Sequence, residues 1–114
     1  MTAEDFLSVL VSEVPEAKPV VREHLEHYDE LLLHVLTADL RRYATDIFTS
    51  GQSDVLGRLL GVIDRALLLG NESVSNAIAV SFVEDSGWWD PVMQPFIASW
   101  PPGLKAEARR QQES

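Results

Sequence analysis

The three histidines of this sequence are the residues best suited to metal chemistry, and all lie within one short stretch. The titratable residues of this stretch are Glu23, His24, Glu26, His27, Asp29, Glu30 and His34. Imidazole and carboxylate groups together bind zinc or iron, and helical bundles place such ligands three or four residues apart. If one helix ran through the stretch, four side chains would share one side of it: Glu23, His27, Glu30 and His34. One hypothesis is therefore a metal- or small-ligand-binding bundle that uses His27, Glu30 and His34.

The competing interpretation is that these histidines are solvated side chains on a charged helical surface. Metal sites of helical bundles draw their ligands from several helices. This sequence has no histidine outside the stretch and no cysteine, so an opposing helix could offer only carboxylates. The lack of cysteine also excludes disulfides, thiolate zinc sites and thiol nucleophiles. We favour this interpretation and expect no cofactor.

No motif typical of an enzyme active site is present. None of the serines lies in a Gly-x-Ser-x-Gly or a Ser-x-x-Lys pattern, and the isolated glycines form no phosphate-binding loop. The adjacent carboxylates Glu4–Asp5 and Glu84–Asp85 point in different directions on a helix, so their spacing makes no acid–base pair. We therefore expect a protein that is not an enzyme.

Tryptophans and carboxylates gather near the end of the chain and form a candidate binding site. The candidate partner-binding residues are Glu84, Asp85, Trp88, Trp89 and Asp90. Tryptophan is enriched at the energetic centres of interfaces, but a small domain also needs Trp and Phe for its own core. Because Trp88 and Trp89 cannot face the same way, we expect at least one of them to be partly exposed. The spacing of Phe96 and Trp100 favours packing inward.

The charge of the chain limits the classes of partner. It has 18 acidic and 9 basic residues, for a formal net charge of -9. Such a charge opposes binding to nucleic acid and to anionic lipid. Acidic residues near the start do not suit a signal peptide, and no apolar run reaches the ~18 residues of a membrane span. We expect a cytoplasmic protein that binds neither nucleic acid nor a membrane.

The negative charge is distributed unevenly along the chain. Residues 1–30 carry eight acidic and two basic residues, residues 31–70 carry four of each, and residues 71–100 carry four acidic residues and no Lys or Arg. If the two acidic segments lay side by side, they would form a negative face able to attract a basic partner. The alternative is a soluble surface with unpaired carboxylates.

Apolar spacing predicts three helices in the first half of the chain. The first covers residues 3–13 and begins with a Thr2–Asp5 capping box. A second follows the prolines over about 19–28, and a third covers about 29–48 and stops at Gly51. We expect a bend between these two at Asp29, which would act as an N-cap.

A short helical hairpin is predicted in the second half. Ser53 caps a helix that ends at Gly70 as a left-handed C-cap, and Asn71 caps the next helix, over about 72–85. That second helix is apolar on nearly every side, which is typical of a buried helix at the centre of a domain. A turn and a short helix then lead to Trp100.

The fold class predicted from these elements is an all-α bundle of five to seven helices. Two successive helix pairs favour a HEAT-like stack of helical hairpins, although no repeat of fixed period is present. We expect residues 1–114 to form a single domain, whose tail from about residue 104 is helical but frayed at its end.

Two stretches resemble a known family. They are residues 24–36 (HLEHYDELLLHVL) with Asp39 and Leu40, and residues 69–72 (LGNE) running into 76–84 (NAIAVSFVE). Together they are similar to a bacterial domain-of-unknown-function family of small helical proteins, some of them suspected immunity proteins of toxin systems. The resemblance covers about residues 20–86, outside the Trp-rich end. It implies a helical, non-enzymatic, inhibitory protein and brings no active site.

Three hypotheses follow for function. The favoured one is a non-catalytic interaction domain that binds a basic protein, of which an immunity or antitoxin protein is one form. The alternative is the metal- or small-ligand-binding bundle described above. The third is a homo-oligomer with a structural role, in which the Trp88 region would be buried between copies.

Overall fold

The helices of this chain follow its apolar pattern closely in a computed structural model, which describes residues 1–113. The α-helices are α1 (Ala3–Glu13), α2 (Lys18–Tyr28), α3 (Leu33–Thr49), α4 (Ser53–Leu69), α5 (Glu72–Ala77), α6 (Gln94–Ala98) and α7 (Pro102–Glu113). Three 3-10 helices and one π-helix complete the set: η1 (Pro15–Ala17), η2 (Ile78–Val83, the π-helix), η3 (Glu84–Ser86) and η4 (Pro91–Met93). No strand occurs within residues 1–113, so the predicted all-α bundle is confirmed.

Helix α1 begins and ends where the sequence predicts. The Thr2 hydroxyl accepts a hydrogen bond from the Asp5 backbone at 3.1 Å, and the Asp5 carboxylate accepts one from the Thr2 backbone at 2.9 Å. This reciprocal pair satisfies two of the donors that a helix start leaves open. The backbone N–H of Asn71 also donates to the Met1 carbonyl at 2.7 Å, which ties the start of α1 to the turn between α4 and α5.

The junction between α2 and α3 differs from the prediction. Asp29 is not an N-cap: it ends α2 as a C-cap in the left-handed region, with φ +58°. Aspartate adopts this conformation more readily than most residues. The next helix starts only at Leu33, because Leu32 is extended and its N–H donates to His24 Nε2 at 3.0 Å. The Leu32 backbone is therefore held out of a helical conformation by its hydrogen bond to His24, eight residues earlier, so α2 and α3 are two helices.

The turn between α4 and α5 is as short as predicted, but Gly70 plays another role. Its backbone is extended rather than left-handed, with φ −69° and ψ 153°. Glycine is needed because a Cβ at this position would lie 2.3 Å from the Ala66 carbonyl oxygen and 2.6 Å from Val74 Cγ1. Asn71 is the predicted N-cap, since its side chain accepts from the Val74 N–H at 3.0 Å. Ser53 is the first residue of α4 rather than its cap.

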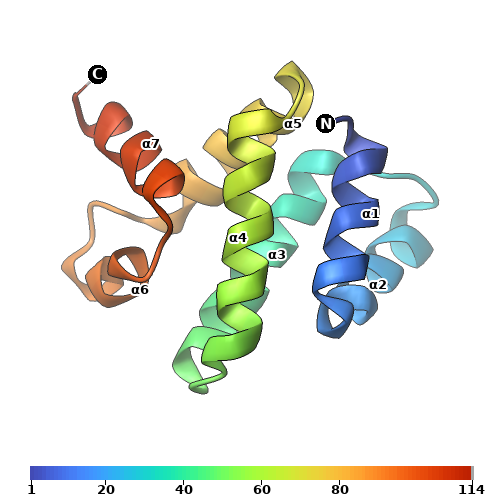
Figure 1. The fold of residues 1–114 in the computed structure, drawn as a ribbon, viewed down its shortest axis with the longest axis horizontal. Coiled ribbons are helices and arrows are strands. Elements are labelled where there is room, and N and C mark those ends of the chain that lie inside the picture. Colours follow the sequence, from blue (N-terminus) through green and yellow to red (C-terminus); the bar gives the residue numbers. More distant parts are fainter. Residues whose placement is uncertain (114) are drawn as a thin grey trace.

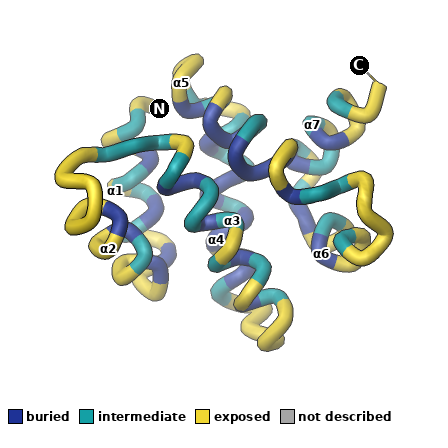
Figure 2. The backbone as a smooth tube through the Cα atoms, turned by 180° about the vertical axis from the view of Figure 1, so that it is seen from behind, coloured by how far each residue is buried: buried dark blue, intermediate teal, exposed yellow. Residues whose placement is uncertain are grey.

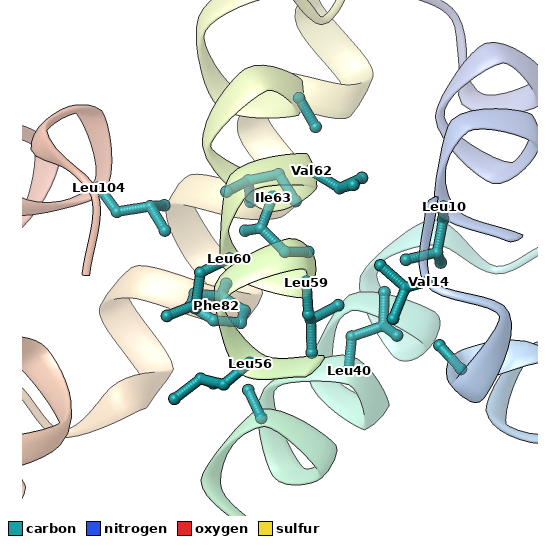
Figure 3. Close-up of a cluster of buried hydrophobic side chains, with 14 of the residues drawn as sticks. Leu10, Val14, Leu40, Leu56, Leu59, Leu60, Val62, Ile63, Phe82 and Leu104 are labelled. Atoms are coloured by element: carbon teal, nitrogen blue, oxygen red, sulfur yellow. The ribbon is translucent and has the colours of Figure 1, made fainter. Parts of the chain in front are cut away.

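Helix α4 lies in the middle of the bundle, between α1 and α7 (Figure 1). Its buried residues are Leu56, Leu59, Leu60, Val62, Ile63 and Ala66. Figure 3 shows Leu59 on the side of Val14 and Leu40, and Leu60 beside Phe82. One helix therefore joins the first part of the chain to its last part in a single core.

The predicted central helix after Asn71 is buried but not regular. Its α-helical part ends at Ala77 and continues as the π-helix η2, which packs against α3, α4 and α7. Helix α3 makes two polar contacts with Ser81 of this wide turn. Arg41 Nε donates to its carbonyl at 3.3 Å, and His34 Nδ1 lies 2.9 Å from its hydroxyl. A π-helical turn is a rare feature that the sequence pattern did not indicate.

The tail is a helix packed on α4. It begins at Pro102, and Leu104 and Ala108 are buried. The Leu104 N–H donates to Asp64 Oδ1 at 2.8 Å, which satisfies one of the open donors at the start of α7. The fraying expected at the end of the tail falls in part on Ser114, outside the described residues.

Two arginines of α4 hold the end of α1 and the turn that follows it. Arg58 donates from both terminal nitrogens to the Glu16 carboxylate, at 2.9 and 2.7 Å, and Nη1 also reaches the Glu13 carbonyl at 2.9 Å. Arg65 pairs with the Glu13 carboxylate. The hydrogen bonds from Arg58 lower the pKa of Glu16 to about 2, against an ordinary value of 4.5.

Replacing Gly70 with alanine will test the close approach at the α4–α5 turn. We expect Gly70→Ala to lower the free energy of unfolding by about 1–3 kcal/mol, because Val74 or the Ala66 carbonyl must shift. The matched control is Gly57→Ala in the exposed face of α4, where a Cβ meets nothing within 4 Å. That variant should be more stable by about 0.5–1 kcal/mol. Urea unfolding measures both, and equal effects would contradict the assignment.

The Glu16–Arg58 pair predicts a pH-dependent stability. Because the folded-state pKa of Glu16 is below its unfolded value, the pair stabilises the fold fully above pH 4.5. The contribution is lost as pH falls toward 2. The difference in Tm between the wild type and Glu16→Gln should therefore shrink between these pH values. Circular dichroism melts give that difference, which will be small because both side chains are about 40% exposed. A difference independent of pH would remove this role for Glu16.

Candidate functional site

The tryptophan-rich segment forms a loop at one edge of the molecule. The chain leaves η3 through Gly87, whose φ of +73° reverses its direction, and continues through η4 into α6. Figure 1 shows this loop in orange on the side of α6 and α7, and Figure 2 shows its outer part as exposed. Of the predicted residues, Glu84, Asp85, Trp89 and Asp90 are exposed at this edge, whereas Trp88 packs against the core.

The two neighbouring tryptophans have different environments. Trp88 is half-buried, and its ring N–H donates to Gln111 Oε1 of α7 at 3.1 Å. Trp89 packs its ring edge-to-face on Trp88, with 5.4 Å between centroids, and remains 65% exposed. The expectation that at least one of the pair is partly exposed is confirmed. Phe96 and Trp100 are buried, as their spacing predicted.

Exposed carboxylates surround Trp89 in the sequence. Glu84, Asp85 and Asp90 are all exposed, and none pairs with a basic side chain within residues 1–113. Asp90 also accepts from the Val92 N–H at 3.0 Å and so begins η4. Val92 is 80% exposed. Residues 84–92, which we call the 84–92 segment, therefore carry exposed carboxylates together with exposed apolar side chains.

Basic side chains approach the neighbouring helix α6 from α7. Lys105 and Arg109 line a hollow there together with Gln94 and Ile97 of α6. The run without Lys or Arg extends from residue 66 to residue 104. The acidic character is therefore a property of the 84–92 segment and does not extend over α7.

The structure brings the start of the second acidic segment close to the first, because α5 contacts α1, but it does not bring residues 84–92 there. Helices α1 and α2, which carry most of the charge of residues 1–30, lie at one side of the molecule in Figures 1 and 2. The 84–92 segment lies at the opposite side, and α3 and α4 stand between them. The carboxylates of the 84–92 segment are therefore separate from those of α1 and α2, whereas Glu72 belongs to α5, which contacts α1.

The histidine stretch does not form the shared helical side that a metal site required. The helix breaks between Tyr28 and Leu33, so His27 lies in α2, Glu30 in the connection and His34 in α3. All three side chains are exposed, and His34 contacts Ser81. Within residues 1–113, no group of three or more His, Asp or Glu side chains is placed to hold a metal ion.

His24, which was not among the proposed ligands, is the histidine with a structural role. It is 2% exposed, and its Nε2 accepts the Leu32 N–H that separates α2 from α3. Its Nδ1 lies 3.9 Å from Asp39 Oδ2 and has no hydrogen-bond partner. The sequence offered one signal, since His24 follows Val21 by three residues on the buried face of α2.

Comparisons with known proteins add one match. A family model described as a domain of unknown function (DUF7674) matches residues 7–114. The match extends beyond the residues 20–86 that carried the resemblance and includes the 84–92 segment. Neither the curated proteins nor the solved structures gave a match. Within residues 1–113, no helix is both long and apolar enough to cross a membrane.

Replacing the two neighbouring histidines of α2, His24 and His27, should change the free energy of unfolding by different amounts. We expect His24→Ala to lower the free energy of unfolding by about 2–4 kcal/mol, because it leaves a cavity and removes the acceptor of the Leu32 N–H. His27→Ala, in the same helix but exposed, should change it by about 0.5 kcal/mol or less. Urea unfolding compares them. Similar losses for both variants would show that the His24–Leu32 hydrogen bond contributes little.

Proposed function

This chain belongs to the DUF7674 family, a domain of unknown function, and we propose that it is a non-catalytic protein-interaction domain. Its partner is a basic protein, which it binds through the 84–92 segment. In its most concrete form, the domain is an immunity or antitoxin protein of the bacterial cytoplasm that occupies a basic surface of a toxin.

The exposure of Trp89 is the observation that carries this proposal. The side chain is 65% exposed although Phe96 and Trp100, a few residues later, are buried. An exposed tryptophan contributes little to folding and leaves a large apolar surface in water, whereas at an interface it is a frequent energetic centre. Val92, three residues later and 80% exposed, is a second apolar side chain of this segment left in water.

The charge of the segment supports a basic partner. Glu84, Asp85 and Asp90 carry negative charge that no Lys or Arg of residues 1–113 neutralises by direct pairing. Unpaired charge of one sign increases the rate at which an oppositely charged protein is encountered, and this effect weakens with added salt. In this proposal the apolar side chains provide most of the binding free energy, and the carboxylates increase the association rate.

Capture from the native cell lysate will test the role of Trp89. The tagged wild-type chain should retain a basic protein at low salt that Trp89→Ala retains much more weakly. The control is Leu69→Ala, because Leu69 is 64% exposed at the α4–α5 turn, and it should bind like the wild type. Quantitative mass spectrometry of the eluates measures both. Equal retention by the two variants, an acidic partner, or capture of the chain's own copies alone would contradict the proposal.

The kinetics of the purified pair will test the carboxylates. The triple variant Glu84→Gln, Asp85→Asn and Asp90→Asn should lower the association rate about tenfold at low salt and flatten its salt dependence. A second triple variant with the same net charge is the control: Glu4→Gln, Glu26→Gln and Glu30→Gln. Its association rate should fall much less, because these exposed residues lie on the side of α1 and α2. Equal rates for the two triple variants would show that only net charge matters.

A further inference from the structure

The edge of the molecule that carries the 84–92 segment also carries a basic hollow. This hollow lies between α6 and α7 and has a volume of about 240 Å³. Ile97 and Ala98 of α6 line it together with Lys105, Ala108 and Arg109 of α7. No carboxylate of residues 1–113 is part of its lining. The hollow therefore combines apolar surface with two positive charges.

The two cations of the α6–α7 hollow have no electrostatic partner. Neither Lys105 nor Arg109 makes an ion pair or a side-chain hydrogen bond within residues 1–113. Arg110, the next residue of α7, is in contrast held by Glu107. Lys105 and Arg109 are four residues apart and so share one side of the helix. Both are therefore available to carboxylates from another molecule.

The 84–92 segment lies directly beside this hollow. Gln94 lines the hollow, and its Nε2 donates to the Trp88 carbonyl at 2.8 Å. The Trp88 ring N–H in turn donates to Gln111 of α7. Figure 1 shows the loop, α6 and α7 together at one edge of the molecule. The exposed Trp89 ring and its unpaired carboxylates are thus neighbours of an apolar hollow with unpaired cations.

A surface with these two neighbouring patches is complementary to a second copy of itself. Around a two-fold axis, each patch of one copy meets the opposite patch of the other copy, so both contacts form at once. Carboxylates of each segment would face Lys105 and Arg109, and Trp89 would cover apolar surface of the hollow. A small anion would also pair with the two cations, but it would leave the Trp89 ring, 65% exposed, in water.

We propose that two copies of this chain form a two-fold symmetric dimer, in which the 84–92 segment of each copy docks on the α6–α7 hollow of the other. The dimer goes beyond the proposed function, because it needs no other protein. A basic protein that binds the same segment must displace the second copy, a consequence that rests on the proposed function.

Analytical ultracentrifugation of the purified full chain will test the dimer. The wild type should show a reversible monomer–dimer equilibrium at micromolar concentration, in moderate salt that screens the repulsion between two acidic copies. Lys105→Glu/Arg109→Glu should raise the dissociation constant about a hundredfold or more, because like charges then face each other in both contacts. The matched control is Lys18→Glu/Arg22→Glu, the same charge change at two exposed, unpaired cations of α2, at the opposite side. It should dimerise like the wild type.

An exchange of charges between the two patches is a stricter test. Glu84→Lys/Asp85→Lys reverses two carboxylates of the segment and keeps Asp90, whose side chain begins η4. This variant alone should be monomeric, as should Lys105→Glu/Arg109→Glu. An equimolar mixture of the two variants should form a heterodimer, because opposite charges face each other again in both contacts. Recovery of the dimer also shows that both variants are folded.

Several outcomes would overturn the dimer. They are a wild type that stays monomeric throughout the micromolar range, a mixture of the two variants that stays monomeric, and loss of the dimer in the Lys18/Arg22 control. A Lys105/Arg109 variant that dimerises like the wild type would also overturn it. So would growth into open chains of copies, because a two-fold contact closes at two. These experiments contain no other protein, so such results contradict the dimer and not the binding of a basic protein, which the lysate capture tests.

Discussion

The burial of α4 on two adjoining faces is the constraint on which the rest of this structure depends. A helix of seventeen residues with six buried apolar or small side chains cannot be covered by one neighbour, so α1, α3, α5 and α7 all contact it. A fully buried leucine or isoleucine contributes about 1.5–3 kcal/mol. The packing of α4 therefore provides much of the energy that brings the first and last helices of the chain into one core.

This central helix leaves the chemically interesting residues at the edges. On the side of α7, the core takes Phe96, Trp100 and Leu104 but leaves Trp89 in water. On the other side, α2 buries little beyond Val21 and His24, so a hollow between α2 and α3 stays open. This hollow and the 84–92 segment are thus separated by the core, and each has its own acidic residues.

Single hydrogen bonds determine how several segments meet. The Leu32 N–H donates to His24 and so separates α2 from α3, which disperses the histidines. Arg58 and Arg65 fasten the end of α1 and the following turn to α4 through Glu13 and Glu16. A buried polar group without a partner is costly, and two buried side-chain nitrogens of residues 1–113, His24 Nδ1 and Trp100 Nε1, have none.

The sequence alone predicted correctly those features that depend on neighbours within a few residues. The all-α class, the Thr2–Asp5 capping box, the Asn71 cap and the inward packing of Phe96 and Trp100 are of this kind, since a helix repeats every 3.6 residues. Other features depend on partners distant in the chain or absent from any local pattern. Asp29 becomes left-handed where the Leu32 N–H donates to His24, and Gly70 is extended against Ala66 and Val74. Residues 84–92 lie apart from α1 and α2 because α3 and α4 fill the space between them. The apolar periodicity of a helix shows which of its faces is buried but not which other helix covers that face. The covering helix is determined by side-chain packing in the tertiary structure.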